Sequence, residues 1–277
     1  LIRGNDSKNS RRIYIYICSA VLLFIASMRS PEWTANYSGI DTVSYRDYFE
    51  SSFYMDWGEF WSSAHLRYIK GVGDGDIGFM LLVKIIGFFT HDFAIYSLLA
   101  DLIFFIPFGI LLYRYCDSIS QITFAYVFYI ALIQVFLLAG GRQVFAFGFD
   151  LMALLATLDR RKLQTVIFVL LAVTIHFSSL LFVIPLLLLW MNVSADTLKK
   201  AHLLCFALFP IVLAFPNQLI VFMGESVGME KYADYGKGEI VGGALTFIIL
   251  IALLSVFCYV AIKKDILHQN EDMRKFY

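Results

Sequence analysis

The chain has 277 residues, of which 60% are hydrophobic, 17% aromatic and only 16% charged, whereas a soluble domain is about half apolar and a quarter charged. Lysine and arginine number 22, aspartate and glutamate also number 22, and the formal net charge is zero. These values exclude an ordinary soluble domain, and the balanced charge argues against nucleic-acid binding. We predict a single all-α, polytopic integral membrane domain over residues 1–277, with roughly seven to nine hydrophobic helices, because each span uses about 20 apolar residues.

Residues 13–28 are apolar and directly follow Arg11 and Arg12. Under the positive-inside rule, this order predicts a signal anchor whose N-terminus lies in the cytoplasm. The first span then runs outward, and residues 29–92 are expected to form an outer-face loop with interfacial helices. The chain begins at Leu1 without an initiator methionine, which is compatible with a partial chain.

The apolar runs that follow cover residues 77–89, 93–113, 121–139, 144–158, 163–190, 202–222 and 243–262. The first of them contains Lys84 and, at about 1.5 Å per residue, is too short for a hydrocarbon core of about 30 Å. We therefore expect an interfacial or re-entrant helix there. With this helix not spanning, the basic turn at residues 159–162 lies inside and residues 140–143 lie outside, as the positive-inside rule requires.

The run at residues 163–190 is longer than one ordinary span and carries His176 near its middle. It forms either one long tilted helix or a hairpin that turns near His176. We prefer the hairpin, which keeps the lysine pairs at 199–200 and 263–264 inside and makes residues 223–242 a second outer-face loop. Because irregular backbone at membrane depth must be buried in protein or line a wet cavity, the hairpin predicts that His176 lines a cavity.

Two ionisable residues stand out against the apolar sequence. An imidazole at His176 is costly there unless it has a partner, which makes it a functional candidate. The alternative is a histidine that bonds a backbone carbonyl and fixes helix packing. Arg142 follows two glycines and precedes Gln143, and a guanidinium at the membrane boundary can bind phosphate through two donors. Its alternative is an arginine that extends to the interface without a ligand.

Several polar segments carry weaker indications. Asp41 supplies a carboxylate ahead of a tyrosine-rich stretch that includes Tyr45, although it could simply cap the helix that follows. Tyr232 and Tyr235 offer aromatic faces on which sugars could stack, but tyrosine is also common at membrane interfaces.

Residues 71–78 contain a GxGxxG pattern, yet this segment follows no strand, and the carboxylates of Asp74 and Asp76 would repel phosphate. A nucleotide-binding loop is therefore not expected. The same two carboxylates are similar to the DxD pair that binds divalent metal in some glycosyltransferases, but a solvated turn is the more common interpretation.

Taken in order, these residues resemble the EpsG family of polysaccharide polymerases, which is related to Wzy-type O-antigen and capsule polymerases. The positions that carry the resemblance are Arg29, Gly39, Asp41, Tyr45, residues 76–79, residues 141–143 with Ala146, and His176 with Ser178 and Ser179. Family members often have Glu-Pro near Asp76, and they usually have alanine where this chain has Ser179. The resemblance covers about residues 13–240, and it rests on the joint order of short motifs.

The resemblance implies a multi-pass protein of the bacterial inner membrane, with a helical bundle similar to the GT-C class of glycosyltransferases. Its implied activity joins undecaprenyl-diphosphate-linked oligosaccharide units into a capsule, O-antigen or exopolysaccharide on the outer face. The implied partners are the lipid-linked glycan, the bilayer, a chain-length regulator and a flippase. No cofactor is expected, because the donor supplies the energy, and Asp74 and Asp76 support a divalent metal only weakly.

The resemblance also assigns roles. Arg142 would stabilise the charge that grows on the diphosphate leaving group, assisted by Arg29 or Lys70. His176, or else Asp41, would accept the proton of the attacking hydroxyl as general base. Further substrate contacts are expected from Tyr45, Gln143, Ser178, Tyr232 and Tyr235.

The sequence is also compatible with three other functions. A flippase or secondary transporter would use Arg142, His176 and Asp41 to bind anions or relay protons, although no internal repeat is visible. A membrane acyltransferase would also use an intramembrane histidine. A structural or partner-binding subunit would use the polar outer loop as a docking surface. It is distinguished by whether Arg142, His176 and Asp41 converge on one outward-open cavity.

Overall fold

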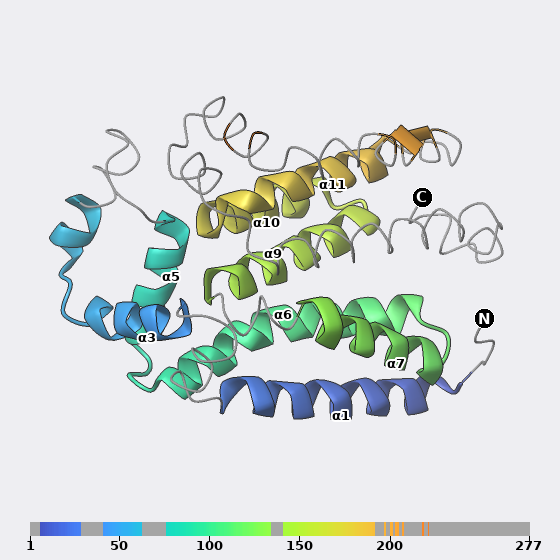
Figure 1. The fold of residues 1–277 in the computed structure, drawn as a ribbon, viewed down its shortest axis with the longest axis horizontal. Coiled ribbons are helices and arrows are strands. Elements are labelled where there is room, and N and C mark those ends of the chain that lie inside the picture. The colour runs from blue at the N-terminus through green and yellow to red at the C-terminus, as the bar shows by residue number, and fades with distance from the viewer. Residues whose placement is uncertain are drawn as a thin grey trace. The chain divides into compact units, whose positions relative to one another are not determined.

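The computed structural model describes residues 6–28, 41–62, 76–133 and 141–191, together with a few single helical positions beyond them. Contacts divide the chain into two units, Leu1–Trp190 and Met191–Tyr277, and the elements below belong to the first unit. In these described ranges every regular element is helical, without a strand (Figure 1). The all-α prediction is therefore confirmed for this part of the chain, while the single-domain prediction stays a prediction.

Three of the described helices are long and apolar enough to cross a membrane, namely α1 (Lys8–Ser27), α6 (Phe93–Tyr115) and α9 (Gly141–Leu158). Shorter apolar helices are α5 (Ile77–Gly87), α7 (Ile119–Phe128), which continues as a π-helical turn at Tyr129–Ile133, α10 (Lys162–Ile175), and α11 (Val183–Trp190). A further helix, α3 (Asp41–Ser52), is more polar in sequence than these helices and follows α1 in the chain. The chain thus has the helices of an integral membrane protein.

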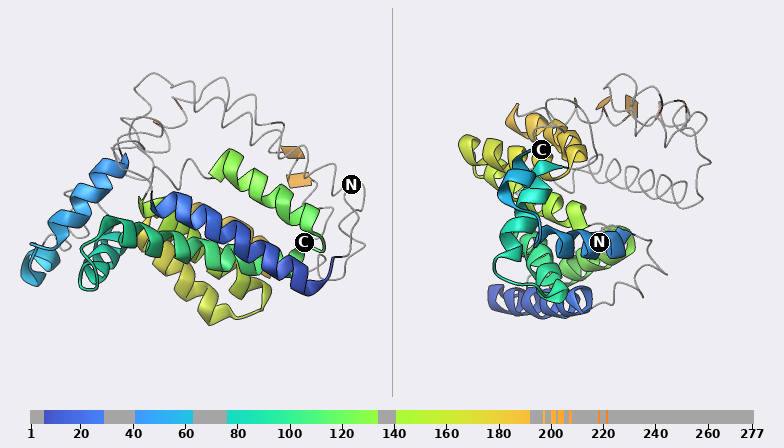
Figure 2. Two further views of the ribbon diagram at one scale, coloured as in Figure 1. Left: turned by 90° about the horizontal axis from the view of Figure 1, so that it is seen from below. Right: turned by 90° about the vertical axis from the view of Figure 1, so that its left-hand side faces the viewer.

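The long helices pack in a defined order. α6 contacts α1 on one side and α9 on the other, and α9 contacts α10, so that α6 lies between α1 and α9 in Figure 1. The view from below in Figure 2 shows α1 beside α6 again. A Cβ atom on Gly148 of α9 would lie 2.5 Å from the carbonyl oxygen of Ile103 on α6. Only glycine therefore allows these two backbones to approach so closely.

The start of α1 and the ends of α6 and α9 lie at one end of this helix set. The Arg11 guanidinium donates to the carbonyl oxygens of Tyr113, at 3.5 Å, and of Cys116, and Arg114 forms an ion pair of 2.8 Å with Asp159. We name this region the basic end, after the cations that it contains: Arg11, Arg12, Arg114, Arg160, Arg161 and Lys162. The positive-inside rule predicts that the basic end faces the cytoplasm.

α5 agrees with the prediction of a short helix that does not span. Its length is only about 17 Å at 1.5 Å per residue, and its buried Lys84 ammonium is satisfied within the protein. The Lys84 Nζ atom donates to the carbonyl oxygens of Ser52, at 3.4 Å, and of Met55, and it lies 5.0 Å from the ring centroid of Trp57. The lysine therefore ties α5 to the segment after α3.

Candidate functional site

Polar side chains from four separate segments meet beside the start of α9. Asp76 precedes α5, Arg142 lies in the first turn of α9, His176 follows α10, and Tyr45 belongs to α3. The Arg142 Nη1 atom lies 3.2 Å from Oδ2 of Asp76, and the Nδ1 atom of His176 lies 3.6 Å from the same oxygen. The Nε atom of Arg142 donates a hydrogen bond of 3.1 Å to the Tyr45 hydroxyl. We name these four residues the Asp76 cluster.

Two glycines let the helices that carry the cluster approach one another. A Cβ atom on Gly78 would lie 2.5 Å from Oγ1 of Thr174 and 2.7 Å from its carbonyl carbon, so α5 can sit against the end of α10 only without a side chain there. A Cβ atom on Gly141 would lie 3.0 Å from the ring of Tyr45. These contacts bring α5 to α10 and α3 to α9 at the point where the cluster forms.

Asp76 occupies the N-cap position of α5, but its side chain makes no capping hydrogen bond. Its backbone carbonyl accepts the first helical hydrogen bond, from the amide of Met80 at 3.1 Å. The carboxylate is thus available to α9 and α10, and its side chain is only 22% exposed. An ion pair that is partly shielded from water is stronger than an exposed surface pair, because the local dielectric constant is lower.

The Arg142 guanidinium is held from two sides before any ligand binds. Asp76 contacts Nη1, and Tyr45 accepts a hydrogen bond from Nε while its ring centroid lies 5.8 Å from Cζ of the arginine. The Arg142 side chain is 30% exposed, so a ligand can still reach it. A positioned guanidinium with five donors suits the oxygens of a phosphate group.

His176 is the C-cap of α10, where its amide donates to the carbonyl of Ala172 at 2.8 Å. Its side chain is 17% exposed, and among the described residues its buried Nδ1 atom has no hydrogen-bond partner. The nearest carboxylate, that of Asp76, is slightly beyond hydrogen-bonding distance. A small movement of the imidazole would make Nδ1 the donor to Asp76 and leave Nε2 as an acceptor, which is the arrangement of an oriented general base.

The chain reverses at His176. The backbone there is extended, with φ −152° and ψ 112°, and a 3-10 turn at Phe177–Phe182 follows. The Ser179 hydroxyl in this turn donates a buried hydrogen bond of 2.8 Å to Oδ2 of Asp150. Asp150 lies about 12 Å further along α9 than Arg142, on the same helix face. The chain therefore runs back along α9, and the hairpin predicted for residues 163–190 is confirmed.

Asp150 is a polar residue that the sequence analysis missed. It is 3% exposed and lies in a helix that is long and apolar enough to span a membrane. The sequence does contain one indication of its role, which is its spacing. Arg142, Ala146 and Asp150 follow one another at intervals of four residues. A single carboxylate in an apolar helix, on the same helix face as an arginine, is expected to have a buried polar partner.

The other predicted site residues do not belong to the Asp76 cluster. Asp41 begins α3, the helix of Tyr45, but its side chain lies outside the described part of the chain. Gln143 is half-buried beside Arg142, and Ser178 is exposed, whereas its neighbour Ser179 makes the buried hydrogen bond. Five predicted residues fall outside the described ranges altogether, and their placement stays a prediction: Arg29, Lys70, Asp74, Tyr232 and Tyr235.

The structure gives Asp76 a different partner from the metal that a DxD motif would hold. Its carboxylate contacts the guanidinium of Arg142 and lies near the imidazole of His176. Within the described ranges, no group of three or more histidine, cysteine or acidic side chains is arranged to hold a metal ion. Of Arg142, His176 and Asp41, the first two converge, because both lie close to Oδ2 of Asp76.

Comparison with known proteins identifies the family of the chain. A family model described as the EpsG family matches residues 8–277, which is nearly the whole chain. No curated protein and no solved structure matches the chain. The matched region includes every residue of the Asp76 cluster. The chain therefore belongs to the EpsG family, a family of Wzy-like polysaccharide polymerases.

Proposed function

We propose that this protein joins oligosaccharide units carried on undecaprenyl diphosphate into a surface polysaccharide, on the outer face of the bacterial inner membrane. The observation that carries the proposal is the convergence of Arg142 and His176 on Asp76. A polysaccharide polymerase with a lipid-diphosphate donor needs a cation for its leaving group and a base for its acceptor. The cluster holds one of each within contact of a single carboxylate.

The placement of the cluster supports chemistry on the outer face. Arg142 lies in the first turn of α9, whereas Asp159, which follows this helix, pairs with Arg114 at the basic end. The length of α9 separates the two regions by about 25 Å. If the basic end faces the cytoplasm, as the positive-inside rule predicts, the Asp76 cluster lies at the opposite membrane boundary.

The proposed reaction exchanges one bond for another at the anomeric carbon of the donor. The bond from this carbon to the diphosphate oxygen breaks, and a bond to the acceptor oxygen forms. The hydroxyl proton of the acceptor passes to Nε2 of His176, and the Arg142 guanidinium stabilises the charge that develops on the diphosphate. Asp76 orients both groups, and Asp41, which begins the helix of Tyr45, is the second candidate for the base.

The proposal also includes the fold class, the product, the partners and the further substrate contacts that the family resemblance implies. The helices form a bundle similar to the GT-C class, and the product is an exopolysaccharide, capsule or O-antigen. A flippase supplies the lipid-linked glycan and a chain-length regulator assists. Additional contacts to diphosphate or sugar come from the side chains that the resemblance points to, namely Arg29, Lys70, Gln143, Ser178, Tyr232 and Tyr235.

The test compares Arg142→Ala and His176→Ala with Arg114→Ala, a control that removes an arginine from the opposite end of the same unit. The purified chain is placed in liposomes with a lipid-linked oligosaccharide, and product length is measured on a gel. We expect single units with the first two variants and long chains with the control. Long chains with all three variants would show that polymerisation does not depend on Arg142 or His176.

The same variants in cells distinguish the competing functions. Glycan units that accumulate on the outer face indicate lost polymerisation, as we expect. Units trapped on the inner face would instead indicate a flippase, and a polymer of normal length that lacks acyl groups would indicate an acyltransferase.

A further inference from the structure

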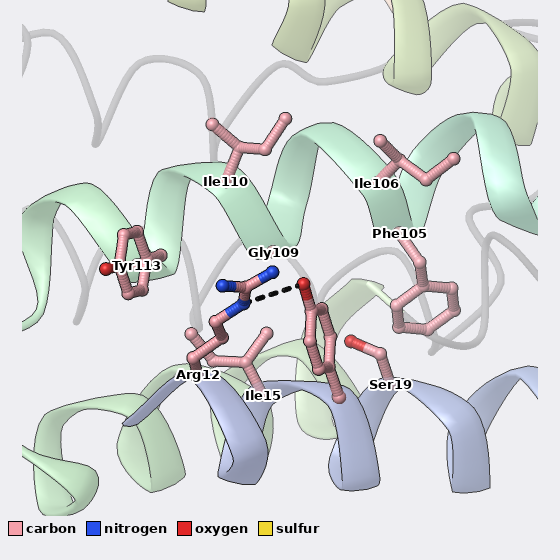
Figure 3. Close-up of a pocket in the computed structure, with 9 residues that line it drawn as sticks. Arg12, Ile15, Ser19, Phe105, Ile106, Gly109, Ile110 and Tyr113 are labelled. Carbon is pink, nitrogen blue, oxygen red and sulfur yellow. Dashed lines mark hydrogen bonds between the residues drawn. The ribbon is translucent and has the colours of Figure 1, made fainter. Parts of the chain in front are cut away.

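A cavity of about 440 Å³ lies between α1 and α6, which is within the range of about 300–1,000 Å³ that ligand sites occupy. Its lining is mostly apolar and includes Arg12, Ile15, Phe105, Ile106, Gly109 and Ile110. Figure 3 shows Arg12 extending from α1 toward Gly109 of α6, with Ile106 and Ile110 on the same helix beside it. The cavity is thus an apolar groove with a cation at one end.

Gly109 keeps the groove open between the two helices. A Cβ atom at this position would lie 3.3 Å from Cγ2 of Ile15, which is tighter than ordinary van der Waals contact. The rim of the groove faces away from the protein core, since Ile106 is 56% exposed and Ile110 is 40% exposed. In a membrane these side chains contact lipid, so an acyl chain can enter the groove from the bilayer.

Within the described part of the chain, no carboxylate neutralises the cation at the end of the groove. Arg12 donates from Nε to the Tyr16 hydroxyl at 3.0 Å, and its Cζ lies 5.4 Å from the Tyr16 ring centroid. Among the described residues Arg12 has no ion pair, whereas Arg114 at the same end is paired with Asp159. Lys8 lies one turn earlier on the same face of α1 and is exposed, which adds a second positive charge nearby.

We propose that this groove binds one anionic phospholipid of the cytoplasmic leaflet, with an acyl chain along Ile106 and Ile110 and the phosphate on Arg12. Basic pockets between membrane helices on the cytoplasmic side are sites of this kind, because the guanidinium offers charge and the groove offers apolar surface. The lipid fastens α1 to α6 at the basic end. This binding goes beyond the polymerase function and does not depend on it, because the Asp76 cluster lies at the other end of the helices.

The experiment titrates the purified full-length chain in detergent with phosphatidylglycerol and counts the bound lipids by native mass spectrometry. Arg12→Gln removes the charge, and the matched control Arg114→Gln removes a neighbouring arginine that has a carboxylate partner. Ile110→Trp fills the groove, and Ile17→Trp adds the same bulk to an exposed position of α1 outside it. Circular dichroism verifies the helix content of every variant.

We expect Arg12→Gln to weaken the binding of one phosphatidylglycerol about fivefold, as the loss of one cation near an anionic headgroup should. Ile110→Trp should reduce the number of tightly bound lipids by one, and both controls should bind as the wild type does. Phosphatidylcholine should bind equally weakly to the wild type and to Arg12→Gln.

Three results would overturn the proposal. The first is unchanged phosphatidylglycerol binding in both Arg12→Gln and Ile110→Trp. The second is an equal loss in the Arg114→Gln control, which would indicate a general effect of surface charge. The third is displacement of phosphatidylglycerol from the groove by undecaprenyl phosphate at a lower concentration, which would make the groove a site for the lipid carrier.

Discussion

Replacement of Asp76 by asparagine separates the chemical role of the cluster from its structural role. Asparagine has nearly the same shape, and its side-chain oxygen can still accept from Nη1 of Arg142, which lies 3.2 Å from the aspartate oxygen. The variant loses only the negative charge that faces the guanidinium and the imidazole of His176. Because both side chains of the ion pair are less than one third exposed, losing the charge of one charge-assisted hydrogen bond should cost about 1–2 kcal/mol of stability.

The expected effect on polymerisation is much larger. A general base contributes about 100- to 10,000-fold to a rate, and it depends on the group that orients it and stabilises its protonated form. We therefore expect Asp76→Asn to slow chain extension at least about 100-fold. Asp76→Ala should lower the thermal stability of the protein in detergent more than Asp76→Asn does, because it also removes the oxygen that accepts from Nη1 of Arg142.

The assay follows product length with a lipid-linked oligosaccharide in liposomes, beside thermal unfolding of the same preparations. The control is Asp159→Asn, which removes the carboxylate of the ion pair with Arg114 at the basic end. The reasoning is refuted if Asp76→Asn extends chains within about tenfold of the wild-type rate. It is also refuted if Asp159→Asn slows extension equally.

Three further predictions concern single residues. Ser179→Ala leaves the Asp150 carboxylate buried without the 2.8 Å hydrogen bond, and should cost about 1–3 kcal/mol in thermal unfolding. Gly78→Ala places a Cβ atom 2.5 Å from Oγ1 of Thr174, so it should displace α5 and reduce chain extension. Burial raises the pKa of the Cys116 thiol to about 11, so its reaction with a maleimide at pH 8 should be slower than that of an ordinary thiol and should accelerate as the pH rises.

Each of these predictions has its own control. Ser178→Ala removes a hydroxyl that is exposed, and an equal loss of stability there would contradict the role of the buried pair. Normal chain extension in Gly78→Ala would contradict the close contact between α5 and α10. For Cys116, the comparison is the same chain unfolded in detergent, and equal rates before and after unfolding would refute the raised pKa.

Features that depend on a short stretch of sequence were predictable. The break at His176 follows from a polar residue in an apolar run too long for one span, and the short α5 follows from the position of Lys84 near the end of a brief apolar run. The position of Arg142 at the start of a helix follows from the two glycines before it. In each case the cost of burying polar groups in a membrane determines the local structure.

Features that depend on partners distant in the sequence were not predictable. The sequence marks Asp76 as part of the family resemblance and of a solvated turn or weak metal motif, but it does not reveal the contact with Arg142, which lies 66 residues away in the chain. The choice between Ser178 and Ser179 depended on the 3-10 turn, which directs Ser179 toward Asp150. Sequence patterns identify which side chains are costly to bury, but only the packing of α5, α9 and α10 determines how they are paired.

The pairing within the Asp76 cluster bears on how a polymerase of this kind would handle its substrate. Without a ligand, the charge of Arg142 is balanced by Asp76, and His176 lies 3.6 Å from the same carboxylate oxygen. A bound diphosphate would bring negative charge to the guanidinium and compete with Asp76 for it. The carboxylate would then be free to accept from Nδ1 of His176, and an imidazole held in this way is a better acceptor at Nε2. On the proposed function, donor binding itself would therefore prepare the base for the acceptor.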